Sequence, residues 1–94
     1  MKRRAAKASA HRLGGRLWTV AHETPLSGTW GHCDHDRRRI SVEPNAAPAM
    51  MLDTLIHEGL HACCPYLSEE VVGVTATELK DMLLAEGVVP PAGN

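Results

Sequence analysis

Two histidines and a glutamate within one short stretch carry the clearest chemistry in this sequence. They form the string His57-Glu58-Gly59-Leu60-His61. On a helix, side chains at i and i+4 project from one face about one turn apart. The imidazoles of His57 and His61 can therefore meet one zinc ion at roughly 2.0–2.1 Å each. Glu58 would point beside the ion, where its carboxylate can act as a catalytic base toward water.

A third protein ligand has to come from outside this string, leaving one zinc position open. The strongest candidates are two glutamates at the start of a predicted downstream helix. Glu69 lies at the edge of that helix's buried face, whereas Glu70 is rotated by about 100° toward solvent. We favour Glu69 and keep Glu70 as the alternate. Cys64 would complete a His/His/Cys set, although a cysteine in this position is more often packed and inert.

Three other side chains are candidates for contacts with a substrate or a transition state. They are Tyr66, His32 and His35. The two histidines lie in the segment Trp30-Gly31-His32-Cys33-Asp34-His35-Asp36, which offers several metal-ligating side chains. Cys33 has no partner at zinc-finger spacing, so we interpret the segment as a hairpin turn near the mouth of a cleft. His32, Asp34 and His35 remain weaker candidates for the third ligand.

The metal-binding string needs a helix to align its side chains, and residues 49–63 have a helical apolar period. Pro48 suits the first turn of that helix, and Pro65 ends it. The apolar stripe consists of Leu52, Leu55, Ile56, Gly59, Leu60 and Cys63. The opposite face carries Thr54, His57, Glu58 and His61. We expect the stripe to be buried and the histidines to line a cleft.

The remaining elements predict an α+β domain. Ser68 is the expected N-cap of a last helix that runs to about residue 86, buries Val72, Ala76, Leu79 and Leu83, and ends at Gly87. Residues 17–22, 29–33 and 38–42 have strand patterns, with Asp34-His35-Asp36 as a hairpin turn. Ile40 and Val42 would share one side of their strand. The pattern predicts a short antiparallel or mixed sheet of about three strands, packed on the metal-binding helix and followed by a C-terminal helix.

Length and composition limit the classes of protein that fit. A chain of 94 residues with 44% hydrophobic side chains predicts one folded domain, residues 1–94. A net charge of −1 excludes a global attraction to nucleic acid or membrane. Three cysteines, two of them adjacent, are a poor disulfide framework. With no expected secretory signal or membrane span, we place the protein in the cytoplasm.

Basic residues concentrate at the N-terminus. Residues 1–16 contain six lysines and arginines and no acid. We expect a flexible basic arm, and the alternative is an arm that binds nucleic acid or another partner. Residues 88–94 are expected to form a C-terminal tail.

The segment Thr54-Leu55-Ile56-His57-Glu58-Gly59-Leu60-His61-Ala62 resembles the active-site helix of small zincins. The chain is similar to SprT-like and ImmA/IrrE-like metallopeptidases, which are minimal gluzincins, and to short phage or prophage proteins. The resemblance covers residues 28–84. It implies a sheet packed on the active-site helix, one zinc ion, and hydrolysis of a peptide or protein substrate lying along an edge strand. By resemblance, His57 and His61 are ligands, Glu58 is the base, and a downstream glutamate is the third ligand. SprT relatives use a third histidine, and no histidine follows His61 here.

The sequence therefore supports one main function and two alternatives. The main hypothesis is a zinc metallopeptidase. The first alternative is a zinc-binding interaction module without turnover, in which the metal serves folding. The second is a nucleic-acid-associated protein that acts through the basic N-terminal arm. Neither the substrate nor the oligomeric state follows from the sequence.

Overall fold

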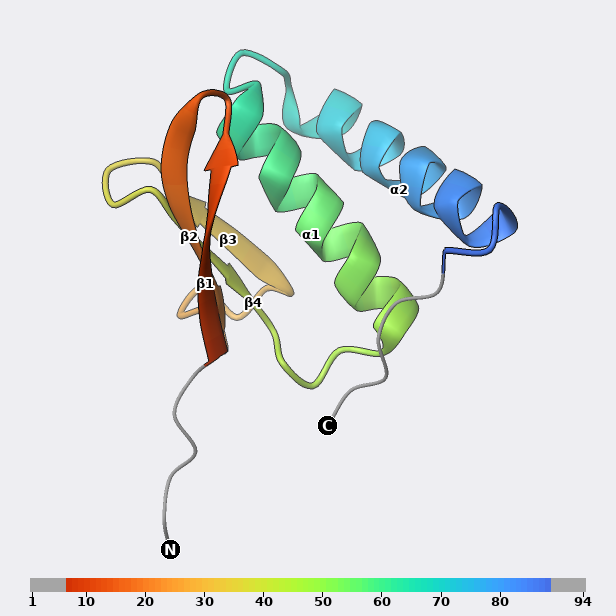
Figure 1. The fold of residues 1–94 in the computed structure, drawn as a ribbon, viewed down its shortest axis with the longest axis horizontal. Helices are drawn as coiled ribbons and strands as arrows, with labels where there is room; N and C mark the ends of the chain where they lie inside the picture. The colour runs from red at the N-terminus through yellow and green to blue at the C-terminus, as the bar shows by residue number, and fades with distance from the viewer. Residues whose placement is uncertain (1–6, 89–94) are drawn as a thin grey trace, which may run out of the picture.

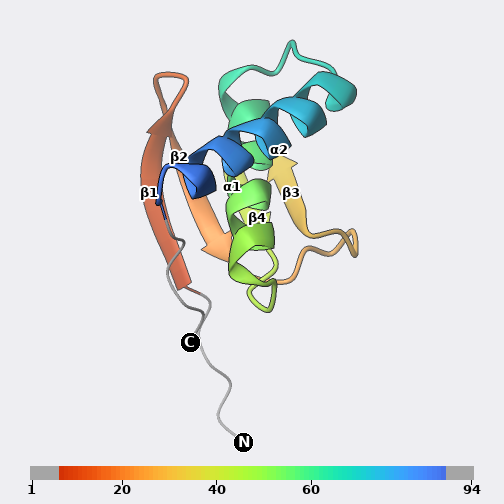
Figure 2. The same ribbon diagram turned by 90° about the vertical axis from the view of Figure 1, so that its right-hand side faces the viewer.

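The computed structural model describes residues 7–88. Its elements are β1 (Lys7–Leu13), β2 (Arg16–His22), β3 (Gly31–Asp34), β4 (Arg39–Val42), α1 (Pro48–Cys63) and α2 (Glu69–Ala85). Both helices lie on the same side of the sheet, and α1 lies between the sheet and α2 (Figure 1, Figure 2). The predicted α+β class is confirmed. Neither helix in the described part of the chain combines the length and the apolar character that a membrane crossing requires.

The sheet is mixed and has four strands, one more than the sequence predicted. Its order is β1-β2-β4-β3. β1 pairs antiparallel with β2, β2 pairs parallel with β4, and β3 pairs antiparallel with β4. The predicted hairpin between the last two strands is confirmed. β3 is an edge strand, and α1 contacts it directly.

β1 is the strand that the sequence analysis missed. Gly14 and Gly15 both have positive φ, 60° and 80°, and Leu13 pairs with Arg16 around them. Two central residues with positive φ make a type I′ turn, whose twist suits a two-residue hairpin. The prediction of a flexible arm is therefore wrong for residues 7–16, because hairpin pairing with β2 orders them. Residues 1–6 of that predicted arm, and residues 89–94 of the predicted tail, lie outside the described residues.

The hydrophobic core forms where α1 crosses the middle strands. Its buried residues are Trp18, Val20, Ile40, Val42 and Ala62. Ile40 and Val42 are 1% and 0% exposed, whereas the residues between and before them are half-buried, so the predicted alternation is confirmed. Removing side chains of this size from water contributes about 1.5–3 kcal/mol each before entropy is counted. The core therefore fixes α1 against the sheet.

α1 begins and ends where the prolines predict, but it buries a different face. Its buried residues are Thr54, Glu58 and Ala62. The predicted apolar stripe is only half-buried at most positions, and Cys63 is exposed. The expectation of a buried stripe is wrong, because α1 packs against β3 and β4 on one side and against α2 on another. The expectation that His57 and His61 line a cleft is confirmed.

α2 follows the prediction closely. The Ser68 hydroxyl accepts a hydrogen bond from the Val71 amide at 3.2 Å, which caps the helix. At the other end, Gly87 has φ 89°, its amide donates to Leu84, and the Val88 amide donates to Leu83. This is a Schellman ending, which favours glycine at the left-handed position. Val72 and Ala76 are buried, and Leu79 and Leu83 are half-buried.

Candidate metal centre

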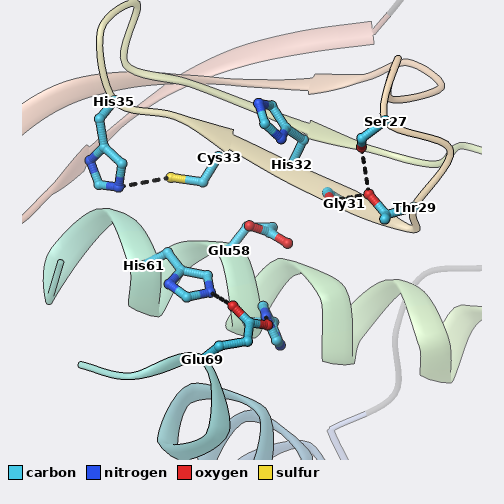
Figure 3. A pocket seen from close by; sticks show the side chains of 10 residues that line it. Ser27, Thr29, Gly31, His32, Cys33, His35, Glu58, His61 and Glu69 are labelled. Carbon is cyan, nitrogen blue, oxygen red and sulfur yellow. Dashed lines mark hydrogen bonds and ion pairs between the residues drawn. The ribbon is translucent and has the colours of Figure 1, made fainter. Parts of the chain in front are cut away.

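The side chains of His57, His61 and Glu69 converge between the two helices. One ligand atom from each lies within 4.8 Å of the others. The Nε2 atom of His57 is 2.7 Å from Glu69 Oε1, and the Nε2 atom of His61 is 2.7 Å from Glu69 Oε2. The two imidazole centroids are 5.0 Å apart. One carboxylate therefore faces both imidazoles, each through its own oxygen, and Figure 3 shows the contact with His61.

Local structure places these three groups with little freedom. His57 and His61 are one turn apart on α1, as the i and i+4 spacing requires. A short connection follows, in which the Leu67 amide donates to the Cys64 carbonyl at 3.0 Å. Ser68 then caps α2, so Glu69 is the first residue of that helix. The tight turn and the cap together carry the Glu69 carboxylate back to the histidine face of α1.

The Glu69 carboxylate is held in its charged form. Its side chain is 74% exposed, so burial, which raises its pKa, is outweighed by the hydrogen bonds and charges of His57 and His61. The net effect lowers the pKa of Glu69. A deprotonated carboxylate facing two imidazole nitrogens is the state that a divalent cation needs.

Glu58 has the opposite environment on the neighbouring face of α1. The residue is 8% exposed, and within residues 7–88 its carboxylate takes part in no hydrogen bond and opens on the cleft. Burial raises the pKa of Glu58, and Glu69 adds to this, while the nearby histidines oppose it. Figure 3 shows its carboxylate between α1 and β3, at the floor of the same cleft. A buried carboxylate without a fixed partner is suited to exchanging a proton with a bound molecule.

Gly31 of β3 makes this position of Glu58 sterically feasible. A Cβ atom on Gly31 would lie 2.6 Å from Thr54 Cγ2 and 2.9 Å from both Cγ and Oε2 of Glu58. Real Cβ atoms do not approach other atoms this closely, so any side chain here would push Glu58 or β3 aside. Gly31 has no role that the sequence predicts, because nothing local shows that α1 crosses the strand at this residue.

The cleft has a strand wall opposite the helices. It encloses about 440 Å³, and its strand side is formed by Ser27, Thr29, Gly31, His32, Cys33 and His35. The Thr29 hydroxyl donates to the Gly31 carbonyl at 2.7 Å and is itself 2.7 Å from the Ser27 hydroxyl. Burial, with the charges of Glu58 and Asp34, raises the pKa of Cys33 to about 12. The Cys33 thiol is therefore neutral at pH 7.

The other candidate ligands lie apart from the three-residue group. Glu70 is exposed on the next position of α2, and Cys64 is half-buried at the end of α1. Neither shares the 4.8 Å cluster, and no other such cluster forms within residues 7–88. The geometry thus favours Glu69 over both as the third ligand.

The three candidates for substrate contacts have different positions. Tyr66 is 81% exposed in the loop before α2 and does not line the cleft. His32 borders the cleft, but Figure 3 shows its ring on the far side of β3 from Glu58. His35 follows β3 at the end of the cleft near the C-terminus of α1, where its ring packs edge-on against Trp18 at 5.4 Å. Of the three, His35 borders the cleft and also contacts an aromatic ring, although the residue is exposed.

The donor set fits zinc. Two imidazole nitrogens and one carboxylate are the ligands of many catalytic zinc sites, which keep the fourth position open. One ligand atom from each of the three residues lies within 4.8 Å of the others, so a single ion could contact all three. Comparison of the chain with models of protein families, with curated proteins and with solved structures found no match. Any function therefore has to be argued from the site.

Proposed function

We propose that this protein is a zinc-dependent metallopeptidase of the zincin type, with His57, His61 and Glu69 as ligands of one zinc ion and Glu58 as the general base. The observation that carries the proposal is the convergence of both imidazoles on one carboxylate, beside a second carboxylate that is buried and free of hydrogen bonds. A purely structural ion pair would not need the second carboxylate in the same cleft.

The two carboxylates would divide the work according to their surroundings. Bound zinc supplies Lewis acidity toward a peptide carbonyl and a water molecule. Glu58 would accept the proton that this water loses and pass it to the leaving amine. Its raised pKa suits it to both steps, because it can hold the proton between them. The exposed Glu69 would stay charged and hold the metal.

The strand wall supplies the surface for an extended substrate. β3 lies at the edge of the sheet and lines the cleft beside Glu58. An edge strand has free backbone amide and carbonyl groups that an extended peptide can pair with. A substrate in this position would bring its backbone within reach of both the metal ligands and Glu58.

Metal content and cleavage test the proposal together. We expect natively purified protein to contain about one zinc ion per chain by elemental analysis, and to cut members of a broad peptide library. Glu58→Gln should keep the zinc and lower kcat by about 10²–10⁴-fold, the contribution typical of a general base. Glu70→Gln, an exposed change on the next helix, is the control and should keep both properties.

Each failure has a separate meaning. A protein that binds no zinc when zinc is supplied would remove the metal centre and the peptidase with it. Zinc binding without cleavage of any peptide would favour the alternative, an interaction module in which the metal serves folding. Cleavage that survives Glu58→Gln would show that another group is the base.

A further inference from the structure

A second hollow lies beyond one end of the candidate active-site cleft. It encloses about 530 Å³ and is bordered by the β1–β2 hairpin, the turn after β3 and the C-terminal end of α1. In Figure 1 the tip of the β1–β2 hairpin lies beside that end of the helix. A Cβ atom on Gly14, at the tip, would lie 3.3 Å from Cys63 Cα, so the two elements are in close contact. The hollow is therefore a fixed feature of the packed domain.

His35 connects this hollow to the candidate active site. Its side chain borders both the cleft and the second hollow. Its ring lies edge-on to that of Trp18, which also borders the hollow, and its Nε2 atom is 3.7 Å from the Cys33 sulfur. A bound peptide that extends from the cleft past His35 would thus enter the hollow.

The hollow presents two arginines with no carboxylate partner. Arg16 begins β2, and Arg38 precedes β4, where its carbonyl accepts the Thr19 amide at 2.9 Å. Within residues 7–88 neither guanidinium forms an ion pair, although Asp36 also borders the hollow. By contrast, the flanking Arg37 and Arg39 are paired with Asp34 and Glu23. The apolar part of the lining comes from Leu13, Trp18, Ala62 and Pro65.

We propose that this hollow is a substrate subsite for an acidic residue, with Arg16 and Arg38 binding a carboxylate of the peptide that occupies the cleft. Arginine suits the role because its planar guanidinium binds a carboxylate through two parallel hydrogen bonds. The inference rests on the proposed function, since it assigns a substrate class to that same cleft.

The structure also gives the position of the acidic residue. Gly31 marks the level of Glu58, β3 continues from there to Asp34, and His35 is the first residue of the turn that follows. At about 3.3 Å per residue, the three steps from Gly31 to Asp34 span roughly 10 Å of extended strand, and His35 lies just beyond them. The acidic residue should therefore stand three or four residues from the scissile bond, on one side of it only.

The test is a binding comparison that needs no turnover. The probes would be fluorescein-labelled decapeptides of alanine, glycine and serine. Each peptide of the series carries one glutamate at a different position, and each has a twin, a control peptide with glutamine at the same position. Binding to zinc-loaded Glu58→Gln protein would be followed by fluorescence polarisation. We expect the best glutamate peptides to bind roughly five- to tenfold more tightly than their glutamine twins. Two solvent-exposed ion pairs would give an effect of this size. The preference should weaken as salt is added.

Variants then assign the preference to the hollow. Arg16→Gln combined with Arg38→Gln should bring the glutamate and glutamine twins to equal affinity. Lys7→Gln combined with Arg12→Gln is the matched control, because it removes the same charge from β1 residues that do not border the hollow. The control should keep the preference.

Several results would overturn the subsite. They are equal binding of the twins by the parent protein, no measurable binding of any glutamate peptide, or a preference that survives the double arginine change. Lower thermal stability of the arginine variants with an unchanged preference would also overturn it, and would assign the arginines to the carbonyls at the end of α1. A preference that depends on the arginines, in a protein that cleaves nothing, would keep the subsite and remove the peptidase.

Discussion

The floor and the rim of the cleft each hold one glutamate, and the two differ in almost every physical respect. At the floor, Glu58 is 8% exposed and has a raised pKa. At the rim, the Glu69 side chain is 74% exposed, faces two imidazoles at 2.7 Å, and has a lowered pKa. The side chains are chemically identical, so the difference comes from their neighbours alone.

The two environments match the two roles that we propose for these glutamates. Desolvation without a partner favours a carboxylate that takes up a proton, whereas two hydrogen-bonding imidazoles favour one that stays charged. Perturbed carboxylates also occur in structural ion pairs, so mutations must establish what each one does.

The change with the greatest predicted consequence removes the charge of the glutamate at the rim. Glu69→Gln keeps the size of the side chain but removes its charge, so zinc affinity should fall by at least about 100-fold, beyond the roughly 10–100-fold typical when only an outer partner of a ligand is lost. Competition with a fluorescent chelator would measure it. Glu70→Gln should leave the affinity unchanged. Equal losses in both variants would mean that charge near α2, rather than ligation, matters.

The next effect separates the floor from the rim. Gly31→Ala would place a methyl group 2.9 Å from the Glu58 carboxylate oxygen, so we expect Glu58 to shift while the metal ligands stay in place. The rate of peptide cleavage should fall roughly 10- to 100-fold, because displacements of about 1 Å have effects of this size. Zinc stoichiometry should stay the same.

Gly59→Ala is the matched control for that change. Gly59 adjoins Glu58 in α1, but an added Cβ there meets nothing within 4 Å. Alanine should stabilise the helix by up to about 1 kcal/mol in urea unfolding, with unchanged cleavage. If the Gly31→Ala protein loses zinc as well as cleavage activity, the position of Glu58 at the floor and metal binding at the rim are not independent.

The smallest effect concerns a third carboxylate, outside the cleft. Glu23 accepts hydrogen bonds from Arg39 at 2.8 and 2.9 Å and from the Ser41 hydroxyl at 2.7 Å. The bond from Arg39, followed by that from Ser41, lowers the pKa of Glu23 to about 2 from its ordinary 4.5. A lowered folded-state pKa stabilises the protein above pH 4.5, and this stabilisation disappears as the pH falls toward 2.

Glu23→Gln should therefore lower the free energy of unfolding at pH 7 by about 1 kcal/mol, a modest value because solvent reaches both side chains. Urea titrations of both proteins between pH 7 and pH 2 would measure the difference. It should shrink below pH 4.5 and nearly vanish near pH 2. A difference that is constant with pH would show that packing, not charge, holds this contact.

Local patterns predicted those elements whose signals lie close together in the chain. The helical period between Pro48 and Pro65 predicted α1, and Ser68 and Gly87 predicted both ends of α2. The β3–β4 hairpin and the shared face of Ile40 and Val42 followed from alternation. β1 was missed, although Gly14-Gly15 is a recognised signal for a tight hairpin, because the basic composition of residues 1–16 indicated an arm.

The i and i+4 spacing alone places His57 and His61 on one face of a helix, because this spacing acts within a single turn. Local signals also predict a capped helix that begins near Glu69. Which glutamate meets the histidines, and the burial of Glu58 against Gly31, follow from tertiary packing instead. Those contacts join elements that are distant in the chain. They depend on how α1 packs between the sheet and α2, and no local period of the sequence records that packing.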